Sequence, residues 1–286
     1  MKTDILVNGV LNGSVNPQDR GLQYGDGLFE TILIESGCAV FLQEHLERLQ
    51  KGCEALAFPK LDREVIISEV SQLISDKQSG VIKITLTRGV GERGFLPPIS
   101  PNITRLVSYY PSDAPVRKSL TSMALLLCET RLARQPLLAG IKHLNQLERV
   151  LARAELRGEE QLEGLMLDTE GAVIEGTMSN LFIVKDDALI TPKLNSCGVA
   201  GVIRQVVIQQ ARKEGVVCKE AILQLDDVKN SDEIFMTNSL MPVRFVDQLR
   251  LNGVVFDKSG SYAAWALDSV LKAMQQELDM NFGRSI

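Results

Sequence analysis

Two charged residues stand out because each lies among small and apolar neighbours. Lys142 lies within residues 137–145, and Glu175 lies within residues 171–182. An amine held in apolar surroundings is disfavoured as a cation, so its pKa falls and it can form a Schiff base with a carbonyl. A lone buried carboxylate needs a cationic or protonated partner.

One cofactor could use both residues. Pyridoxal 5'-phosphate (PLP) offers an aldehyde to a lysine and a pyridine nitrogen to an acid. The alternative is a surface lysine and a glutamate at the end of a strand, which is the commoner case for any single Lys and Glu. Other features of the sequence are needed to distinguish the two interpretations.

Other catalytic groups are scarce. The chain has two histidines, His45 and His143, so a three-histidine zinc site is impossible, and no acidic cluster has metal-ligand spacing. We therefore expect no metal. Neither histidine lies near a Gly-x-Ser-x-Gly turn, which argues against a Ser-His-Asp triad. The remaining candidates for proton transfer are mainly lysines and carboxylates, which favours Lys142 as the catalytic residue.

Composition limits the partners. The 286 residues are 45% hydrophobic, enough for one large domain or two smaller ones. The net charge of -5 and the absence of a basic run argue against nucleic acid. No segment approaches the roughly 18 apolar residues of a membrane span, and the N-terminus turns too soon for a signal peptide. Five scattered cysteines without a Cys-x-x-Cys predict reduced thiols in a cytoplasm.

The first hundred residues predict hairpins and helices. An Asn8-Gly9 turn joins strands 5–7 and 10–11, and Ser36-Gly37 joins strands 29–34 and 39–42. Helical spacing of apolar residues predicts a helix over 44–56, and Asp62 is the expected cap of a second helix to residue 74. Strands are expected at 81–87 and 103–109.

Residues 89–94 spell Gly-x-Gly-x-x-Gly. A dinucleotide site requires this motif to open a helix, but Pro97 and Pro98 follow and would end one. We therefore predict a flexible loop, which could present Arg88 or Arg93 to a substrate.

The second part predicts a sheet-rich domain after an interdomain linker. Its strands are clustered, which favours an antiparallel or mixed sheet over a doubly wound one. The glycines of 198–201 precede a helix that runs to about Glu214, so its free N–H groups could bind phosphate. The remaining expected elements are a strand at 123–128, a helix at 143–156 with its apolar residues mostly on one face, short strands at 165–167, 172–174, 181–184, 189–191, 216–220, 233–237 and 243–246, and a closing helix at 262–278.

Six modest motifs occur in a specific order along the chain: Asp19-Arg20-Gly21, Tyr24-Gly25-Asp26-Gly27-Leu28-Phe29-Glu30, His45-x-x-Arg48-Leu49, Lys142, Glu175 with Asn180 and Phe182, and Gly198 to Ile203. In this order they resemble the fold-type IV PLP enzymes, a family that includes branched-chain and D-amino-acid aminotransferases and 4-amino-4-deoxychorismate lyases. The resemblance covers essentially the whole chain.

The resemblance implies an α+β fold of two domains. A small N-terminal α/β sandwich would cover residues 1–112, and residues 113–121 would form the linker. A larger C-terminal mixed-sheet domain, with the PLP lysine, would cover residues 122–286. A homodimer is implied as well.

The resemblance also implies residue roles. Lys142 would hold PLP and transfer the proton, and Glu175 would keep the pyridine nitrogen protonated. Arg48 would bind the phosphate, with the N–H groups of Val202 and Ile203 and the hydroxyl of Ser239. Three arginines are candidates for binding substrate carboxylates, and the sequence does not rank them: Arg93, Arg105 and Arg131.

Within the family the chain is most similar to the lyases. The stretches 139–148 and 237–243 carry this likeness, because aminotransferases usually have a Thr-Gly-Thr-Ala-like run where Asn238-Ser239-Leu240-Met241 stands. The implied reaction converts 4-amino-4-deoxychorismate to 4-aminobenzoate and pyruvate on the folate route. The alternatives are a fold-type IV aminotransferase for D-amino or branched-chain amino acids, and a PLP-free small-molecule binder.

Overall fold

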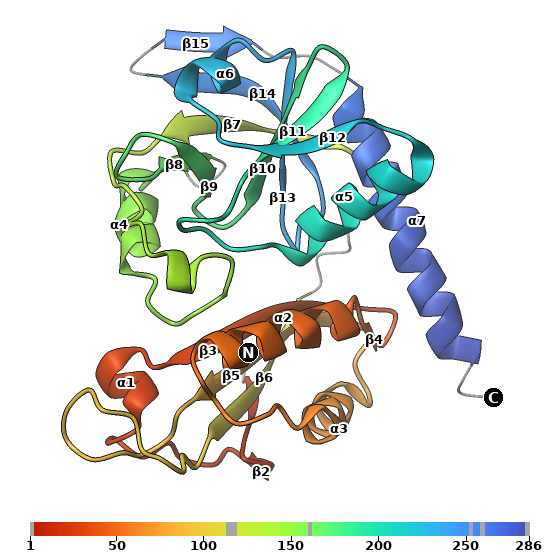
Figure 1. Cartoon of the computed structure of the whole chain (residues 1–286). Helices are drawn as coiled ribbons and strands as arrows, with labels where there is room; N and C mark the ends of the chain where they lie inside the picture. Colours follow the sequence, from red (N-terminus) through yellow and green to blue (C-terminus); the bar gives the residue numbers. More distant parts are fainter. Residues whose placement is uncertain (1–2, 113–118, 160–161, 252–253, 258–260, 284–286) are drawn as a thin grey trace. The chain divides into compact units, whose positions relative to one another are not determined.

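The computed structural model describes the chain except for residues 1–2, 113–118, 160–161, 252–253, 258–260 and 284–286. The chain forms two compact units (Figure 1). Unit 1 comprises Met1–Val116, Ile141–Asn145 and Gln276–Ile286, and unit 2 comprises Arg117–Gly140 and Gln146–Gln275.

Unit 1 is built on an antiparallel sheet, which has six strands among the described residues, in the order β2-β1-β6-β5-β3-β4. Alternate residues of β5, in the middle of the sheet, are buried, as expected for a sheet with one covered face. The elements are β1 (Asp4–Val7), β2 (Val10–Leu11), α1 (Arg20–Tyr24), β3 (Gly27–Glu35), β4 (Cys38–Ala39), α2 (Leu42–Ala55), α3 (Arg63–Ile74), β5 (Ser79–Thr87) and β6 (Thr104–Pro111).

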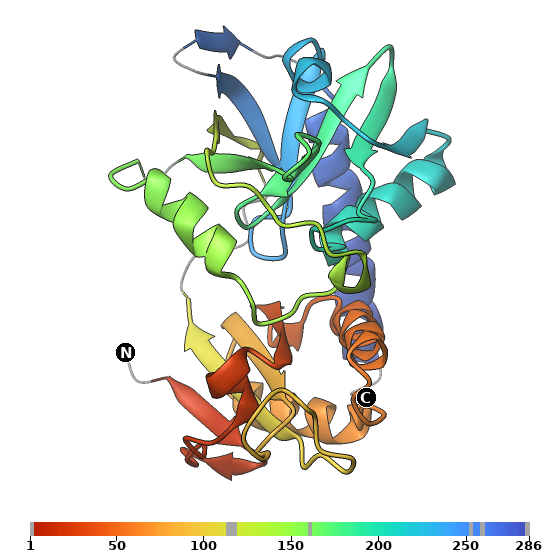
Figure 2. The same ribbon diagram turned by 60° about the vertical axis from the view of Figure 1, so that its left-hand side comes forward.

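Helices α2 and α3 cover the same face of this sheet (Figures 1 and 2). Glu30 of β3 contacts α2, and Arg105 of β6 contacts α3. Cross-strand pairing through β5 places these two side chains on one face. The apolar core between sheet and helices is fully or almost fully buried and includes Leu28, Ile32, Ile82, Ile84, Leu46, Leu49 and Ile66.

Unit 2 contains a mixed sheet of nine strands within the described ranges, in the order β12-β11-β10-β13-β14-β7-β8-β9, with β15 on β14. The pairs β11·β12, β14·β7 and β7·β8 are parallel, and the others are antiparallel. Its strands are β7 (Thr121–Leu127), β8 (Glu163–Leu167), β9 (Val173–Gly176), β10 (Asn180–Lys185), β11 (Ala188–Pro192), β12 (Cys218–Ala221), β13 (Glu233–Thr237), β14 (Arg244–Leu251) and β15 (Val254–Asp257).

Unit 2 also contains helices. They are η1 (Pro136–Leu138), α4 (Leu147–Glu155), α5 (Val202–Glu214), α6 (Leu225–Lys229) and the part of α7 (Tyr262–Gly283) up to Gln275. The core of the unit contains Leu125, Leu181, Ile183, Ile234 and Leu249, all fully buried.

The predicted α+β fold is confirmed, and Asp62 caps α3 by accepting a bond from the N–H of Val65 (3.1 Å). The predicted start of one helix was wrong. The helix predicted from residue 143 begins at Leu147, because the preceding backbone pairs with β3: the N–H of Leu144 bonds to the carbonyl of Gly27 (3.0 Å).

The apolar residues predicted to share a face of this helix are largely exposed. Leu147, Val150 and Leu151 are 76%, 60% and 60% exposed, whereas Ala152 and Leu156 are buried. The predicted strand 39–42 is also shorter, since Leu42 already begins α2.

The predicted domain ranges remain a prediction, because residues 113–118 of the linker lie outside the described residues. Lys142 was expected in the larger C-terminal domain, but its segment, Ile141–Asn145, belongs to unit 1 by its contacts. Among the described helices, none is long and apolar enough to cross a membrane. The described residues also contain no His, Cys, Asp or Glu cluster that could hold a metal ion.

Candidate functional site

Lys142 lies in a short segment fixed against β3. Its carbonyl accepts a bond from the N–H of Phe29 (2.9 Å), and His143 bridges to Leu28. The Lys142 Nζ lies 4.3 Å from the centre of the Phe29 ring, within range of a cation–π interaction. The backbone at the lysine is therefore held by a strand, and its half-buried amine lies over an aromatic face.

Next to Phe29, on the opposite face of β3, Glu30 forms a buried cluster with α2. Arg48 donates to Glu30 through Nε (2.8 Å) and through Nη2 (2.5 Å), and His45 Nδ1 lies 2.6 Å from Glu30 Oε2. Residues three apart on a helix share a face, so α2 directs both side chains at the strand. Glu30 is fully buried.

The cluster has a defined charge state. Burial alone would raise the pKa of Glu30, but the charge and hydrogen bonds of Arg48, helped by His45, lower it to about 2. Burial lowers the pKa of His45, against the pull of Glu30, and the charges of Arg48 and Lys142 lower it further. At neutral pH His45 is therefore uncharged, and its Nδ1 must donate, because an ionised carboxylate only accepts.

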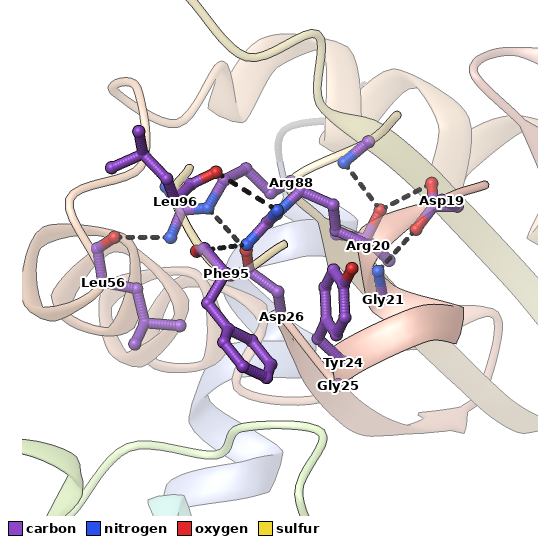
Figure 3. Close-up of polar contacts among 12 residues, drawn as sticks. Asp19, Arg20, Gly21, Tyr24, Gly25, Asp26, Leu56, Arg88, Phe95 and Leu96 are labelled. Carbon is purple, nitrogen blue, oxygen red and sulfur yellow. Dashed lines mark hydrogen bonds and ion pairs between the residues drawn. The ribbon is translucent and has the colours of Figure 1, made fainter. Parts of the chain in front are cut away.

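Arg20 anchors the glycine-rich loop (Figure 3). Its guanidinium donates to the carbonyls of Gly94 (2.9 Å) and Phe95 (2.9 Å) and pairs with Asp26 (2.9 Å). Tyr24 lies beneath the guanidinium and accepts a bond from the N–H of Gly94. The prediction of a loop rather than a helix is confirmed, but this loop is fixed at its carbonyls and not free.

The predicted arginines of unit 1 differ in exposure. Arg88 is buried and bonds to Asp26 (2.8 Å) and to the carbonyl of Leu56 (2.8 Å), so Arg88 and Arg20 share the Asp26 carboxylate (Figure 3). Arg93 is exposed. Arg105 pairs with Glu69 through Nε (2.5 Å) and Nη2 (2.7 Å).

In unit 2, Arg131 donates to the carbonyl of Cys128 (2.7 Å). Each of the three predicted substrate arginines therefore lies on a different element. Their proposed role in binding substrate carboxylates stays a prediction.

Glu175 of β9 in unit 2 is 3% exposed and is bound by three polar groups, which we call the Glu175 cluster. Arg149 of α4 donates to its Oε1. Its Oε2 accepts bonds from the side-chain amide of Asn180 (3.2 Å) and from the N–H of Val199 (2.9 Å). Three donors from separate segments thus hold one carboxylate.

A glycine lets the backbone at Val199 come close enough to donate to Glu175. Gly198 has φ +88°, and a Cβ there would lie 2.7 Å from Ile174 Cγ2. Only glycine adopts this backbone conformation readily. The same stretch binds Gly140, whose N–H donates to the Gly198 carbonyl (2.9 Å) and whose carbonyl accepts from the N–H of Ala200 (3.0 Å). Lys142 follows Gly140 by two residues, so the backbone beside Glu175 also holds the chain that enters the lysine segment.

The predicted phosphate donors Val202 and Ile203 open α5, as expected. The N-cap, Gly201, has no side-chain cap, so the first N–H groups of the helix are available to an anion. A Cβ at Gly201 would lie 2.0 Å from the side-chain oxygen of Asn180. The helix start therefore lies directly against the Glu175 cluster.

Thr237 provides a second indication of a ligand there. Its hydroxyl is buried and has no hydrogen-bond partner among the described residues. Thr237 is paired with Asn180 across β10 and β13, so both side chains share one face of the sheet. The predicted phosphate ligand Ser239 follows two residues later, in a turn where Asn238 Oδ1 accepts the N–H groups of Leu240 (3.0 Å) and Met241 (2.7 Å).

Sequence reasoning missed three of these residues. Glu30 lay in a quoted motif, so its partnership with the helix two elements later could have been suspected. Nothing in the sequence distinguishes Arg149 from Arg153 on the same helix. Thr237 begins the stretch 237–243 compared with the lyases, but no feature of the sequence shows that its hydroxyl is buried. The roles of Lys142, Glu175, Arg48, Val202, Ile203 and Ser239 in binding PLP stay proposals.

Comparison with known proteins gives a consistent family. The model of the family described as "Amino-transferase class IV" matches residues 27–249. An aminodeoxychorismate lyase of Vibrio harveyi is 40% identical over 240 residues, which cover 83% of this chain and 88% of that protein. A putative branched-chain-amino-acid aminotransferase of Methanocaldococcus jannaschii is 32% identical over 247 residues, 84% of this chain and 85% of that protein.

A solved structure agrees along nearly the whole chain. The 4-amino-4-deoxychorismate lyase from Pseudomonas aeruginosa superposes with a TM-score of 0.79 at 36% identity, covering 96% of this chain and 97% of that one. The resemblance to fold-type IV enzymes is thereby confirmed. With the family model matching most of its length and two relatives above 30% identity, the chain belongs to the class IV aminotransferase family, whose members are PLP-dependent enzymes.

Proposed function

We propose that this protein is a PLP-dependent aminodeoxychorismate lyase, which converts 4-amino-4-deoxychorismate to 4-aminobenzoate and pyruvate in cytoplasmic folate biosynthesis. The observation that carries the PLP part of the proposal is the Glu175 cluster. It is a buried carboxylate held by three donors, and its supporting backbone also binds Gly140, two residues before Lys142. The similarity to lyases at 40% and 36% identity supports the choice of reaction.

The polar groups of unit 2 fit this cofactor. A pyridine nitrogen would bond to Glu175, and a phosphate would suit the N–H groups at the start of α5. Ser239 is near in the chain, as is the buried hydroxyl of Thr237, which has no partner among the described residues. In this assignment Arg48 adds a guanidinium to the phosphate, and Glu30 holds that guanidinium in place. When bound, PLP supplies an electron sink for charge that develops on the substrate.

Lys142 would be the proton carrier of the reaction. Its amine removes the proton from the amine-bearing carbon of the substrate ring. The bond between the neighbouring ring carbon and the enolpyruvyl oxygen then breaks, and the ring becomes aromatic. The same amine returns the proton to the methylene carbon of the departing enolpyruvate, giving pyruvate, so atoms and charge balance.

The substrate carries two carboxylates, and cationic donors must hold them. Arg93, Arg105 and Arg131 remain the proposed donors. Arg93 is the one of the three whose side chain is exposed on an anchored loop, whereas Arg105 already has a carboxylate partner in Glu69. Alanine at a true donor should raise KM for the substrate and leave the absorbance of bound PLP unchanged.

We also infer a homodimer. On α4, Leu147, Val150 and Leu151 form an exposed apolar face, and the anchored loop exposes Phe95 and Leu96 by 83% and 87%. Contiguous exposed apolar side chains are typical of association surfaces. Sedimentation of wild type and of Leu151→Glu tests this: a dimer that the variant weakens is expected, and a monomeric wild type would contradict it.

The test of the reaction is a direct assay. Purified protein with aminodeoxychorismate should release 4-aminobenzoate and pyruvate in equal amounts. Amino transfer between D-amino or branched-chain amino acids and keto acids, without lyase turnover, would instead favour the aminotransferase alternative. The similarity to the putative aminotransferase of Methanocaldococcus jannaschii is the reason to test it. A protein without visible absorbance after incubation with PLP would be a PLP-free binder.

A further inference from the structure

We propose that Arg149 is a positioning residue of the cofactor site, which holds the Glu175 carboxylate in an ion pair and directs one further acceptor position of its Oε1 to a protonated ring nitrogen. The inference rests on the proposed role of Glu175. Arg149 is the third residue of α4 and seven residues after Lys142, and its side chain is 14% exposed.

The geometry leaves room for one more donor. An ionised carboxylate offers about four acceptor positions, two on each oxygen. Asn180 and the N–H of Val199 both bond to Oε2, and Arg149 bonds to Oε1. With the donors that the described part of the chain supplies, Oε1 thus retains an acceptor position beside the arginine, and the other donors fix the direction in which that position points.

Burial explains why a cation is needed. Glu175 is 3% exposed, and an ionised carboxylate buried without a cation is strongly destabilising. Asn180 and Val199 donate hydrogen bonds but carry no charge. The nearby thiol of Cys197 is also uncharged at neutral pH, because burial raises its pKa to about 11. Arg149 is the ion-pair partner that the described residues give to Glu175.

The arginine also decides where a shared proton resides. A positive charge in contact with Oε1 opposes protonation of the carboxylate more than protonation of a ring nitrogen beyond it, because Coulomb energy falls with distance. A proton between the two groups therefore stays on the ring. A purely structural ion pair would stabilise unit 2 without this effect.

Arg153 is a matched control on the same helix. Its Nη1 donates to the carbonyl of Leu162 (2.9 Å) and lies 4.0 Å from an oxygen of Glu163, and its side chain is 34% exposed. Glu163 is held by other groups, among them the N–H and hydroxyl of Thr177. Arg153 thus serves a different carboxylate from the one assigned to PLP.

The experiment measures ring protonation without substrate. Wild type, Arg149→Met, Arg149→Gln and Arg153→Met are loaded with PLP labelled with ¹⁵N in the ring, and the ring-nitrogen NMR shift is recorded. We expect a protonated ring in wild type and in Arg153→Met, and a shift toward the neutral ring in both Arg149 variants. PLP affinity, titrated into cofactor-free protein, should fall on the order of tenfold in the Arg149 variants. Arg149→Gln retains a neutral donor, so it serves if Arg149→Met does not fold.

Glu175→Gln separates this proposal from the one it rests on. A protonated ring and normal affinity in the Arg149 variants, with a neutral ring in Glu175→Gln, would overturn the role of Arg149 alone. A protonated ring in all of these variants would overturn both roles. Because no turnover is measured, the outcome does not depend on whether aminodeoxychorismate is the substrate.

Discussion

Glu30 in unit 1 and Glu175 in unit 2 are both buried carboxylates that bind an arginine. His45 is the further donor to Glu30, and Asn180 and the N–H of Val199 are the further donors to Glu175. The two carboxylates differ in where the donors come from. His45 and Arg48 belong to one helix, so Glu30 joins one strand to one helix. The donors of Glu175 come from α4, from β10 and from the turn at Val199, which also binds Gly140.

This difference separates a structural role from a chemical one. Both donors of Glu30 are side chains at helical spacing on α2, and their effect is to lower its pKa to about 2 and to hold Arg48 in place. Glu175 binds the segment that contacts Gly140, two residues before Lys142, and lies against the start of α5, the proposed phosphate site. The comparison predicts that changing Glu175 should mainly affect catalysis, and changing Glu30 should mainly affect stability.

The largest expected effect is on turnover in Glu175→Gln. An amide cannot favour a protonated ring nitrogen as a carboxylate does, so activity should fall by about a hundredfold to a thousandfold. PLP should remain bound. Steady-state lyase kinetics at saturating PLP measure this, and near-normal turnover would remove the distinction between the two carboxylates.

Glu30→Gln should show the opposite pattern. The change removes the carboxylate counter-charge of Arg48, whose side chain is only 11% exposed, so the free energy of unfolding should fall by about 3 kcal/mol or more. Denaturant unfolding measures it. Turnover of the folded fraction at saturating PLP should fall much less than in Glu175→Gln.

The Glu30 effect should depend on pH. The folded-state pKa of about 2 lies below the ordinary 4.5, so the ion pair stabilises the fold above pH 4.5 and this contribution is lost as pH falls toward 2. The stability difference between wild type and Glu30→Gln should therefore shrink over that acid range. A difference that stays constant down to pH 2 would contradict the charge assignment of this cluster.

Arg48→Ala tests whether this arginine also serves the cofactor. Loss of a charge-assisted phosphate contact should weaken PLP binding by about 2 kcal/mol, measured by titrating activity against PLP. Lys51→Ala, an exposed change on the same helix, is the control. Arg48→Ala leaves the buried Glu30 without its arginine, and the double variant Arg48→Ala/Glu30→Gln removes that carboxylate charge as well. If neither Arg48 variant moves the titration midpoint, Arg48 only braces the strand.

The smallest effect is expected at Thr237. Thr237→Val removes a buried hydroxyl that has no partner among the described residues, so stability should stay equal or rise, while PLP affinity falls by about 1 kcal/mol. Thr191→Val is the matched control, because the Thr191 hydroxyl donates to the carbonyl of Leu181 (2.8 Å) and should lose stability without losing PLP. Unchanged PLP affinity in Thr237→Val would remove this hydroxyl from the site.

The sequence predicts what depends on neighbours along the chain. The two hairpins of unit 1, helix α3 with its Asp62 cap and the glycines before α5 follow from local spacing and turn chemistry. The start of α4 at Leu147 does not, because the pairing of residues 142–144 with β3 competes with helix formation and joins segments more than a hundred residues apart.

The same limit applies to the candidate site. Lys142, Glu175 and Arg48 could be singled out by context and motif. The contact of Arg149 with Glu175 depends on tertiary packing, as does the buried hydroxyl of Thr237, which has no partner among the described residues. No spacing in the sequence predicts either feature. The side chains that set the charge around a functional carboxylate are thus harder to predict than the carboxylate itself.

The central claim is that Lys142 carries PLP. Reducing the PLP-loaded protein with borohydride and mapping its peptides measures this directly. The account predicts a single phosphopyridoxyl label on Lys142, absent from Lys142→Ala, which should still bind some PLP without a covalent bond. A label on any other lysine, or none on a protein that turns over substrate, would contradict it.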